Sequence, residues 1–526
     1  MTTERTIRGG PASARGYRSL RHGPGEEVVV RTDLGPAGDV LGTPLITIAH
    51  LSDLHVCDAQ SPARAEFLDR WADPDSPVRD DLDEVGCYRA QELLTAQVAE
   101  AMVSAVNEAA VGPVTRFPID LAIVTGDNTD NAQANELAWY VALLEGGDVC
   151  PDSGDRARWE GVGGLSPDER FWHPETAGLD LPQLRYGFPA VPGLSDAARA
   201  PFRAAGLDMP WLAVHGNHDR LVQGTIPGAG GLDAVAVGAV KAIAVPDHWT
   251  NDVIIHVAVG LERCDPTALA TLMREVRTQP VTADPGRRLI SRQEFVDAHF
   301  GAASRPAGHG FTSSNRANGT TYYRHDHGRV TMLVVDTVNE HGGWQGSLDT
   351  DQLAWLDSEL RAADADRRYA VLASHHPLHT LVNDATGPAS APRVLADQLD
   401  QVIAGHASVV LWLNGHTHHT AVRPHRTWWE VTAPSLIDWP QQGRLVELLH
   451  GPDGLTVATT MLDHAGPAPW DGSIDSPHAL AGLSRELSAN HWQERDHSLE
   501  QHPRSGTAAD RNVLLRLPNP WAAPPQ

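Results

Sequence analysis

Five short patches rich in histidine and carboxylate side chains occur in a fixed order along the chain. Each follows a run of apolar, β-prone residues, so each is expected where a buried strand gives way to a loop. Imidazole and carboxylate groups bind divalent transition metals, and open α/β sheets place active sites at strand ends. The patches therefore predict one metal site that draws on all five. They are Asp53-Leu54-His55, Gly126-Asp127-Asn128-Thr129-Asp130, Gly216-Asn217-His218-Asp219, His375-His376-Pro377 and Gly415-His416-Thr417-His418.

Two of the patches place their candidate ligands two residues apart. Asp53 and His55 form one such pair, and His416 and His418 form the other. Side chains two residues apart project to the same side of an extended chain. We therefore expect both members of each pair to point toward the metals.

The second and third patches add a bridging candidate and a neutral ligand. Two metals about 3.5 to 4 Å apart need one ligand that contacts both, and a carboxylate with two oxygens suits that position. Asp127 is our candidate for this bridge. Asn217 offers an amide oxygen to a metal and leaves the imidazole of His218 free, as acid catalysis requires.

The spread of the patches limits the number of domains. A chain of 526 residues suggests two to four domains by length alone. The patches, however, run from Asp53 to His418, so one site draws on most of the chain. We therefore expect one large catalytic domain interrupted by two long insertions. The expected parts are an N-terminal extension at 1–44, the catalytic domain at 45–465 with insertions at about 146–210 and 221–319, and a C-terminal tail at 466–526 that packs on the domain.

The charge balance narrows the choice of partners and compartment. The formal net charge is −26, and no run of Lys or Arg stands out. This disfavours a nucleic acid polymer as partner, whereas bound metals would still attract a small phosphate ester. There is no apolar segment of transmembrane length and no signal peptide, so we expect a cytoplasmic protein; the oligomeric state stays open. The cysteines form no C-x-x-C pair and fit a reducing compartment; they are Cys57, Cys87, Cys150 and Cys264.

The elements that must position the patches alternate between strands and helices. Short apolar runs precede the patches, and stretches with apolar residues at helical spacing follow several of them. This alternation predicts an α/β fold. Expected strands are 45–50, 120–125, 211–214, 370–373 and 409–413, expected helices are 88–110, 136–144, 349–362 and 479–489, and expected hairpins are 321–335 and 445–461.

The order and wording of the patches resemble a known family. They match the D-x-H, G-D-x-x-D, G-N-H-D, H-x-P and G-H-x-H blocks of the calcineurin-like metallophosphoesterases, most nearly those of an uncharacterised bacterial branch with long inserts between the blocks. The resemblance implies a four-layer αββα sandwich of two mixed sheets flanked by helices. It also implies two metals, with Mn, Fe, Zn and Co all suited to mixed His, Asp and Asn ligation.

The resemblance assigns each candidate residue a role. His218 would contact the phosphate and protonate the leaving group, with Asp219 orienting it. His375 is selected over His376 because the family's ligand lies two places before the proline. One metal would be held by Asp53, His55, Asp127 and His418, and the other by Asp127, Asn217, His375 and His416.

Related subfamilies fit the chain less well. Purple acid phosphatases carry a tyrosine three residues after the bridging aspartate, where this chain has Asp130. Bifunctional nucleotidases follow the last block with a large second domain, and the 108 residues after His418 are too few and too irregular for one.

The resemblance also implies a reaction, namely attack on phosphorus by a hydroxide held between the metals. A small phosphodiester of the cyclic nucleotide or glycerophosphodiester type is the preferred substrate, and a phosphomonoester is the alternative. A non-catalytic scaffold is a third hypothesis, disfavoured because no ligand position is missing.

Several neighbouring residues are given lesser roles. Asp58, Asn128 and Asp130 are candidates for orienting ligand imidazoles. Other histidines and tryptophans are set aside from the site. His325 and His327 are expected at a hairpin tip facing water, and Trp428, Trp429 and Trp439 are expected to pack in the core or at its rim.

Overall fold

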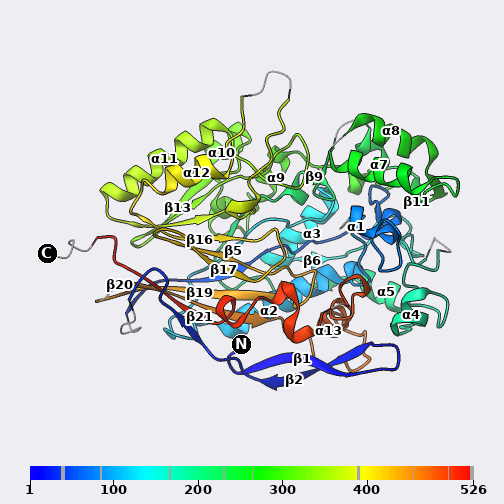
Figure 1. The fold of residues 1–526 in the computed structure, drawn as a ribbon, viewed down its shortest axis with the longest axis horizontal. Helices are drawn as coiled ribbons and strands as arrows, with labels where there is room; N and C mark the ends of the chain where they lie inside the picture. The colour runs from blue at the N-terminus through cyan, green and yellow to red at the C-terminus, as the bar shows by residue number, and fades with distance from the viewer. Residues whose placement is uncertain are drawn as a thin grey trace.

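Two mixed sheets, with helices lying against them, form the centre of the computed structural model (Figure 1). These two sheets confirm the prediction of an α/β fold with mixed sheets. Two residues named above lie outside the part of the chain that the structure describes. They are Cys264 and Asp453, the second of which is in the turn of the expected final hairpin. Those residues are 1–36, 42–82, 86–164, 168–228, 231–263, 265–387, 391–452, 454–495 and 497–521.

The first sheet has seven strands in the order β3-β21-β20-β19-β4-β5-β8. Within it β4, β5 and β8 are parallel neighbours, whereas β19 pairs antiparallel with both β4 and β20. Because the three parallel strands run the same way, their carboxyl ends bring the first three patches to one edge. The strands span Val29–Arg31 (β3), Thr43–Leu51 (β4), Leu121–Val124 (β5), Trp211–Ala213 (β8), Gln442–Gly451 (β19), Gly454–Asp463 (β20) and Val513–Leu517 (β21).

The second sheet has six strands in the order β13-β14-β15-β16-β18-β17. Its four central strands, β14, β15, β16 and β18, are parallel, and the outer two are antiparallel. The carboxyl ends of β15 and β16 carry the last two patches. The strands span Tyr323–His327 (β13), Val330–Val334 (β14), Tyr369–Ala373 (β15), Val409–Asn414 (β16), Ala421–Pro424 (β17) and Trp429–Thr432 (β18).

One hydrophobic core is shared by the two sheets. Successive side chains of a strand point to opposite faces. Met332 of β14 accordingly belongs to the same buried cluster as Ile46 of β4, whereas its neighbour Leu333 packs in a second cluster with Leu356. The second cluster covers the outer face of the six-stranded sheet with α11 and α12, and α2 and α3 add apolar residues to the shared core. These helices span Thr95–Ala109 (α2), Ala134–Glu145 (α3), Thr350–Ala365 (α11) and Ala396–Ile403 (α12).

The segment after β8 builds a unit with a core of its own. Apolar residues of α7 and α8 pack on Phe67 and Leu68, which lie in a short 3-10 helix at Glu66–Trp71. Lys241 of β11 is fully buried where this unit meets the rest of the chain; its Nζ donates to Glu66 Oε1 at 3.0 Å and to the Ser61 carbonyl at 2.6 Å. The elements between β8 and β13 are Leu221–Val222 (β9), Ile226–Pro227 (β10), Leu232–Ala236 (α6), Val240–Ala244 (β11), Asn251–Glu262 (α7), Pro266–Glu275 (α8), Arg277–Pro280 (β12), Arg292–Ala298 (α9) and Ser313–Asn318 (α10). Of these, α9 packs in the core shared by the two sheets.

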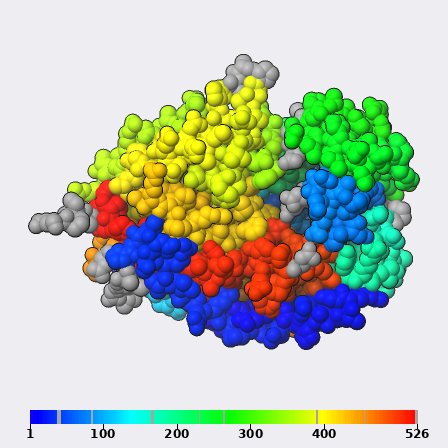
Figure 2. All heavy atoms as spheres, viewed as in Figure 1, coloured from blue at the N-terminus to red at the C-terminus, as the bar shows by residue number. Residues whose placement is uncertain are grey.

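Segments from both ends of the chain lie together on one face. Figure 2 shows the red C-terminal segment running beside the blue N-terminal hairpin. Thr2 Oγ1 donates to Asn512 Oδ1 at 3.1 Å, and Arg511 pairs with Glu26 at 2.9 Å. The chain ends are thus tied to each other, and β3 and β21 extend the seven-stranded sheet. The remaining elements are Arg5–Ala12 (β1), Arg18–Pro24 (β2), Arg79–Leu82 (α1), Asp148–Val149 (β6), Leu181–Tyr186 (α4), Leu194–Arg199 (α5), Phe202–Arg203 (β7) and Pro477–Ser488 (α13).

Two local expectations differ from the structure. His325 and His327 lie within β13, because the turn of this hairpin is formed after them at Gly328, whose φ is +52°. The α-helix expected at 88–110 begins only at Thr95, after a 3-10 turn. Trp428, Trp429 and Trp439 are buried, as expected. Among the described residues, no helix combines the length and the apolar character needed to cross a membrane.

Candidate metal centre

The strand ends bring side chains from all five patches into one largely buried cluster. Four overlapping groups of side chains have ligand atoms within 4.8 Å of one another. Such close packing of imidazoles and carboxylates is typical of a metal site. The groups are Asp53, His55 and His418; His55, Asp127 and His218; Asp53, Asp127 and His375; and His375, His376 and His416.

A left-handed backbone turns the ligand pairs inward. Asp53 and His55 lie beyond the end of β4 with φ of 52° and 45°, and His416 and His418 lie beyond β16 with φ of 69° and 56°. The expectation of an extended, two-residue period at these positions is therefore wrong, although the members of each pair do converge. Asp127 has φ of 50° as well. Non-glycine residues adopt this region rarely, and such strain gathers at functional sites.

In the first group, the ring nitrogens of His55 and His418 and a carboxylate oxygen of Asp53 lie close together. His55 Nε2 lies 3.2 Å from Nε2 of His418 and 4.0 Å from Oδ1 of Asp53. His418 Nε2 is 3.3 Å from the same Asp53 oxygen. Two imidazole nitrogens this close repel each other unless a proton or a metal lies between them.

The second group meets the first at Asp127. Oδ2 of Asp127 lies 3.1 Å from His375 Nε2 and 3.8 Å from His55 Nε2, so one carboxylate oxygen faces both groups. His416 Nδ1 approaches His375 Nε2 to 3.2 Å. This arrangement places Asp127 where a bridging ligand is required.

The outward ring nitrogens of three ligands are already hydrogen-bonded. His55 Nδ1 pairs with Asp130 Oδ1 at 3.0 Å, and His375 Nδ1 donates to the Thr125 carbonyl at 2.8 Å. His418 Nδ1 pairs with Asp438 Oδ2 at 2.6 Å. Each of these bonds leaves Nε2 as the nitrogen that faces the cluster, which is how metal-binding histidines are commonly held.

The amide of Asn217 fits a metal ligand as well. Its Nδ2 donates to the Gly224 carbonyl at 2.9 Å, which fixes the orientation of the amide. Its Oδ1 is buried and has no hydrogen-bond partner. An orphaned carbonyl oxygen is costly in a protein interior, and a cation bound to it removes that cost.

Charge around the cluster favours bound cations. Burial alone would lower the pKa of His375, but the charges of Asp127 and Asp53 outweigh it and raise that pKa to about 9. Burial also disfavours a charged His418, yet its bonds to Asp438 and Asp53 raise its pKa to about 9. Without metals, protons on these rings balance the buried carboxylates.

His218 lies beside the ligands but faces differently. Its Nδ1 donates to the Asp130 carbonyl at 2.7 Å, and its ring centroid is 4.4 Å from that of His55. Burial lowers the pKa of His218, and the nearby charges of Asp127 and Asp130 oppose that effect. With Nδ1 occupied, Nε2 is the nitrogen left to exchange a proton with a substrate.

The structure corrects the expected role of Asp219. Its carboxylate accepts hydrogen bonds from the backbone N–H groups of Gly216 at 2.8 Å, Asn128 at 3.0 Å and Thr129 at 2.9 Å. The ring of His218 is instead oriented by the carbonyl of Asp130. Asp219 therefore joins the loops after β5 and β8, because its two oxygens are taken up by backbone donors.

Of the three residues expected to orient ligand rings, only Asp130 contacts one. The side chain of Asn128 donates to Asp219 and to the Val214 carbonyl. The carboxylate of Asp58 pairs at 3.3 Å with Arg287, which lies in the second inserted segment. His376 belongs to one of the four groups, but both of its ring nitrogens are already hydrogen-bonded, to Thr337 Oγ1 at 2.8 Å and to the Trp344 carbonyl at 2.9 Å.

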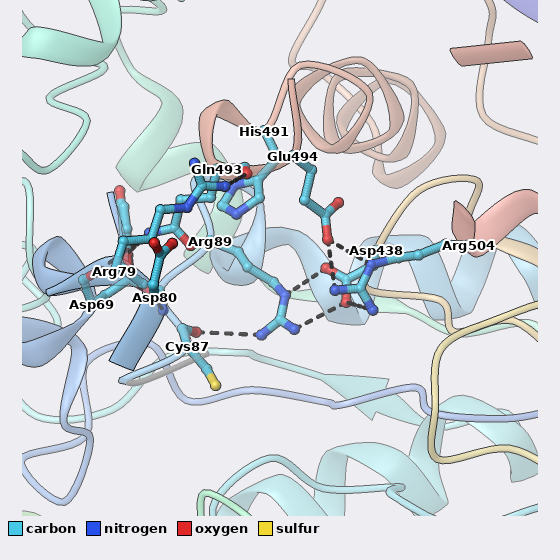
Figure 3. A pocket seen from close by; sticks show the side chains of 12 residues that line it. Asp69, Arg79, Asp80, Cys87, Arg89, Asp438, His491, Gln493, Glu494 and Arg504 are labelled. Atoms are coloured by element: carbon cyan, nitrogen blue, oxygen red, sulfur yellow. Dashed lines mark hydrogen bonds and ion pairs between the residues drawn. The ribbon is translucent and has the colours of Figure 1, made fainter. Parts of the chain in front are cut away.

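Asp438 holds the predicted metal ligand His418 and was missed by sequence reasoning. It lies after β18, the next parallel strand beyond β16, but no histidine accompanies it there. Arg89 donates hydrogen bonds to both carboxylate oxygens of Asp438, at 2.5 and 2.9 Å (Figure 3). Arg504 lies 3.6 Å from Oδ2 of the same carboxylate. These groups line a cavity of about 390 Å³. An acidic residue following a parallel strand was the only available signal.

Arg64 supports the cluster through Asp130 and was also missed by sequence reasoning. Its guanidinium binds Asp130, which holds His55, and also contacts Glu66 at 3.1 Å and Glu92 at 2.8 Å. All of these groups are buried. The interactions form a continuous path from Lys241 through Glu66 and Arg64 to a predicted metal ligand.

Comparisons with known proteins give distant matches only. No family model and no curated protein sequence matches the chain. A dimetal phosphatase from Danio rerio is 12% identical, covering 80% of this chain and 97% of its own, with a TM-score of 0.36. The Plasmodium protein GAP50, an anchor in the inner membrane complex, is 11% identical over 82% of this chain and 86% of its own, with a TM-score of 0.28.

A third solved structure, assigned as a 5′-nucleotidase from Staphylococcus aureus, is 11% identical over 31% of this chain and 33% of its own, with a TM-score of 0.21. The chain resembles the calcineurin-like metallophosphoesterases. Likenesses to solved structures this distant carry no information on activity. The resemblance to metallophosphoesterases rests on the five blocks and on the cluster that they form.

Proposed function

We propose that the protein is a dinuclear metal-dependent phosphoesterase. The observation that carries the proposal is the convergence of ring nitrogens from two ligand groups on a single oxygen of Asp127. The unpartnered Oδ1 of Asn217 supports it, because a carbonyl oxygen buried in such a cluster suits a cation. Two divalent metals bound there would polarise a phosphate ester and lower the pKa of bound water.

We assign seven side chains to the metals. Asp127 is shared between the two sites, as its position between the ligand groups suggests. The metal identities stay open among Mn, Fe, Zn and Co, because imidazole, carboxylate and amide ligands accept all four. The first metal takes Asp53, His55, Asp127 and His418, and the second takes Asp127, Asn217, His375 and His416.

The remaining residues bind and transfer protons. We propose that His218 contacts the phosphate and donates a proton from Nε2 to the leaving oxygen. The bond from its Nδ1 to the Asp130 carbonyl fixes the ring for this role. Asp219 has no part in the proton transfer and holds the loops that carry the ligands.

We propose a small phosphodiester, cyclic or of the glycerophosphodiester type, as substrate, with a phosphomonoester as the alternative. The net charge of −26 argues against a nucleic acid polymer. A non-catalytic scaffold is disfavoured because every ligand position holds a residue type able to bind a metal.

We also propose the finer architecture and location that the sequence suggested. The sheets and helices would stack as a four-layer αββα sandwich in a domain at 45–465, with insertions at about 146–210 and 221–319. The segments 1–44 and 466–526 would act as extensions of this domain. A cytoplasmic location is proposed on the pattern of the cysteines, and neither Cys57 nor Cys150 forms a disulfide in the structure.

Hydrolysis of bis-p-nitrophenyl phosphate with added Mn²⁺ tests the function. The wild-type protein should cleave it, and Asp127→Ala or Asn217→Ala should abolish cleavage and weaken metal binding. Asp148→Asn, at an exposed aspartate paired with Arg203, is the matched control and should change neither. A wild-type protein that binds no metal and cleaves no phosphate ester would disprove the proposal. A panel of cyclic nucleotides, glycerophosphodiesters and monoesters then separates the substrate classes.

A further inference from the structure

Trp344 is a partly exposed aromatic side chain next to the candidate metal centre. All fifteen tryptophans lie in the described part of the chain, and Trp344, at 41% exposure, is the only exposed one. Its ring is stacked on that of His416, with centroids 5.7 Å apart and an interplanar angle of 26°. Since His416 Nδ1 faces His375 Nε2, the indole stands beside a ring assigned to a metal.

The backbone that carries Trp344 is held firmly. The Trp344 carbonyl accepts a hydrogen bond from His376 Nε2 at 2.9 Å. Gly343 N donates to the Thr225 carbonyl at 2.9 Å, and Gly346 N donates to the Thr380 carbonyl at 3.0 Å. The backbone at Trp344 is thereby fixed relative to the turn between β9 and β10, which follows the Asn217 patch, and to the loop after β15.

Further contacts explain how the chain reaches this conformation. Gly343 has φ of +83°, which glycine adopts without strain. The side-chain amide of Asn383 donates to the carbonyls of Gly342 at 2.8 Å and of Gln345 at 3.0 Å, on both sides of the tryptophan. The loop is therefore preorganised, and a ligand that contacts the indole has little ordering cost to overcome.

We propose that Trp344 stacks on an aromatic ring of the substrate, so that the enzyme prefers a phosphate ester whose alcohol carries a nucleobase or an aryl group. This inference rests on the proposed function, because only a phosphate held at the metals brings its ester group to the indole. Every nucleobase and aryl ring has a π-face that an indole can bind. Such a subsite selects by shape and planarity and leaves charge recognition to the metals.

A binding experiment tests the stacking without relying on turnover. Benzylphosphonate and methylphosphonate are titrated by calorimetry into the Mn²⁺-loaded protein. Trp344→Ala should lower the affinity for benzylphosphonate by roughly tenfold or more, which is the scale of one aromatic stacking contact. It should lower the affinity for methylphosphonate much less. Trp344→Phe retains a ring and should recover most of the lost affinity.

Phe117→Ala is the matched control. Phe117 is 55% exposed and precedes β5, whose opposite end carries Asp127, so it lies away from the site. This variant should leave the ratio of the two affinities unchanged. If Trp344 merely shields His416, both phosphonates should weaken by the same factor in Trp344→Ala, and that outcome would overturn the inference.

Kinetic measurements separate this inference from the proposed function and identify the kind of ring. Phenyl, nucleoside and glycerol esters of phosphate, each as a diester and as a monoester, are compared by kcat/KM in the wild type and in Trp344→Ala. A fall confined to the nucleoside ester points to a base, and a fall for both aromatic esters points to any planar ring. Wild-type hydrolysis with ratios that the variant leaves unchanged refutes the stacking alone, whereas absence of hydrolysis refutes the function itself.

Discussion

The histidines proposed as metal ligands are held by hydrogen bonds made on the side away from the cluster. His375 and His418 illustrate this, because Nδ1 of each ring is bonded to an oxygen and Nε2 faces the cluster. The carboxylates that draw metals also draw protons, since both pKa values rise to about 9 when no metal is present. Metals and protons therefore compete for the same nitrogens.

Metal binding near pH 7 should release about two protons, one each from His375 and His418. Because these pKa values are raised, charged rings stabilise the metal-free fold below their unfolded pKa, and this stability is lost as pH rises through 9. Metal affinity should rise over the same range. Calorimetric titration with Mn²⁺ in two buffers of different ionisation enthalpy measures the release. Identical heats in both buffers would contradict it.

Asp438→Asn should weaken metal binding about 10- to 100-fold, as is typical when the partner of a ligating histidine is changed. The substitution removes the charge that orients His418 and leaves Arg89 with one fewer carboxylate oxygen. Competition with a chelating dye measures the affinity. Asp148→Asn, which removes an exposed carboxylate from an ion pair with Arg203, serves as its control. Unchanged affinity in Asp438→Asn would mean that His418 needs no such support.

At the scale of elements, the parallel strands end at the cluster, and the short loops after them orient the proposed ligands. Asp219 links the loops after β5 and β8 through three backbone N–H groups. Its carboxylate is buried, and burial raises its pKa. The geometry of the centre thus depends on a residue that does not face the metals.

Asp219→Ala should lower the free energy of unfolding by roughly 3 kcal/mol, because it leaves several buried donors without an acceptor. Urea denaturation of the metal-free protein measures this change. If any activity remains, the shape of its pH profile should match that of the wild type, since Asp219 does not contact the ring of His218. A shift in either limb of that pH profile would show that Asp219 does take part in proton transfer.

Parts of the fold and of the candidate site could be predicted wherever the sequence carries a local signal for them. The strands before the patches were predicted because apolar runs ending in Asp53, Asp127 or His375 mark a buried strand and its functional end. The left-handed turns were not predicted, because Asp and His carry no strong preference for that conformation. Asp438 was missed because its partner His418 is distant in sequence and only the sheet order brings them together.

Across the whole molecule, the unit after β8 is connected to the metal centre by buried charges. Lys241 reaches Glu66, which binds Arg64, and Arg64 binds Asp130 beside His55. Charges buried this deeply are costly unless each is paired. We therefore expect movement of the inserted unit to be coupled energetically to His55, a proposed ligand of the first metal.

Lys241→Met should destabilise the protein by about 3 to 5 kcal/mol, the scale seen when one partner of a buried ion pair is removed. It should also weaken binding at the metal that His55 contacts. Thermal unfolding and metal titration measure the two effects. Arg203→Met, which breaks the exposed pair with Asp148, should change neither. Loss of stability with full metal affinity would show that the path stops short of His55.

Lys241 is also the only lysine in the chain, and its amine is fully enclosed. An acylating reagent should therefore modify the folded protein at the α-amino group alone. A second label would appear only when the inserted unit detaches from Ser61 and Glu66. The protein thus contains its own single-site probe, and the rate of that second acylation, with and without Mn²⁺, reports how often the unit opens.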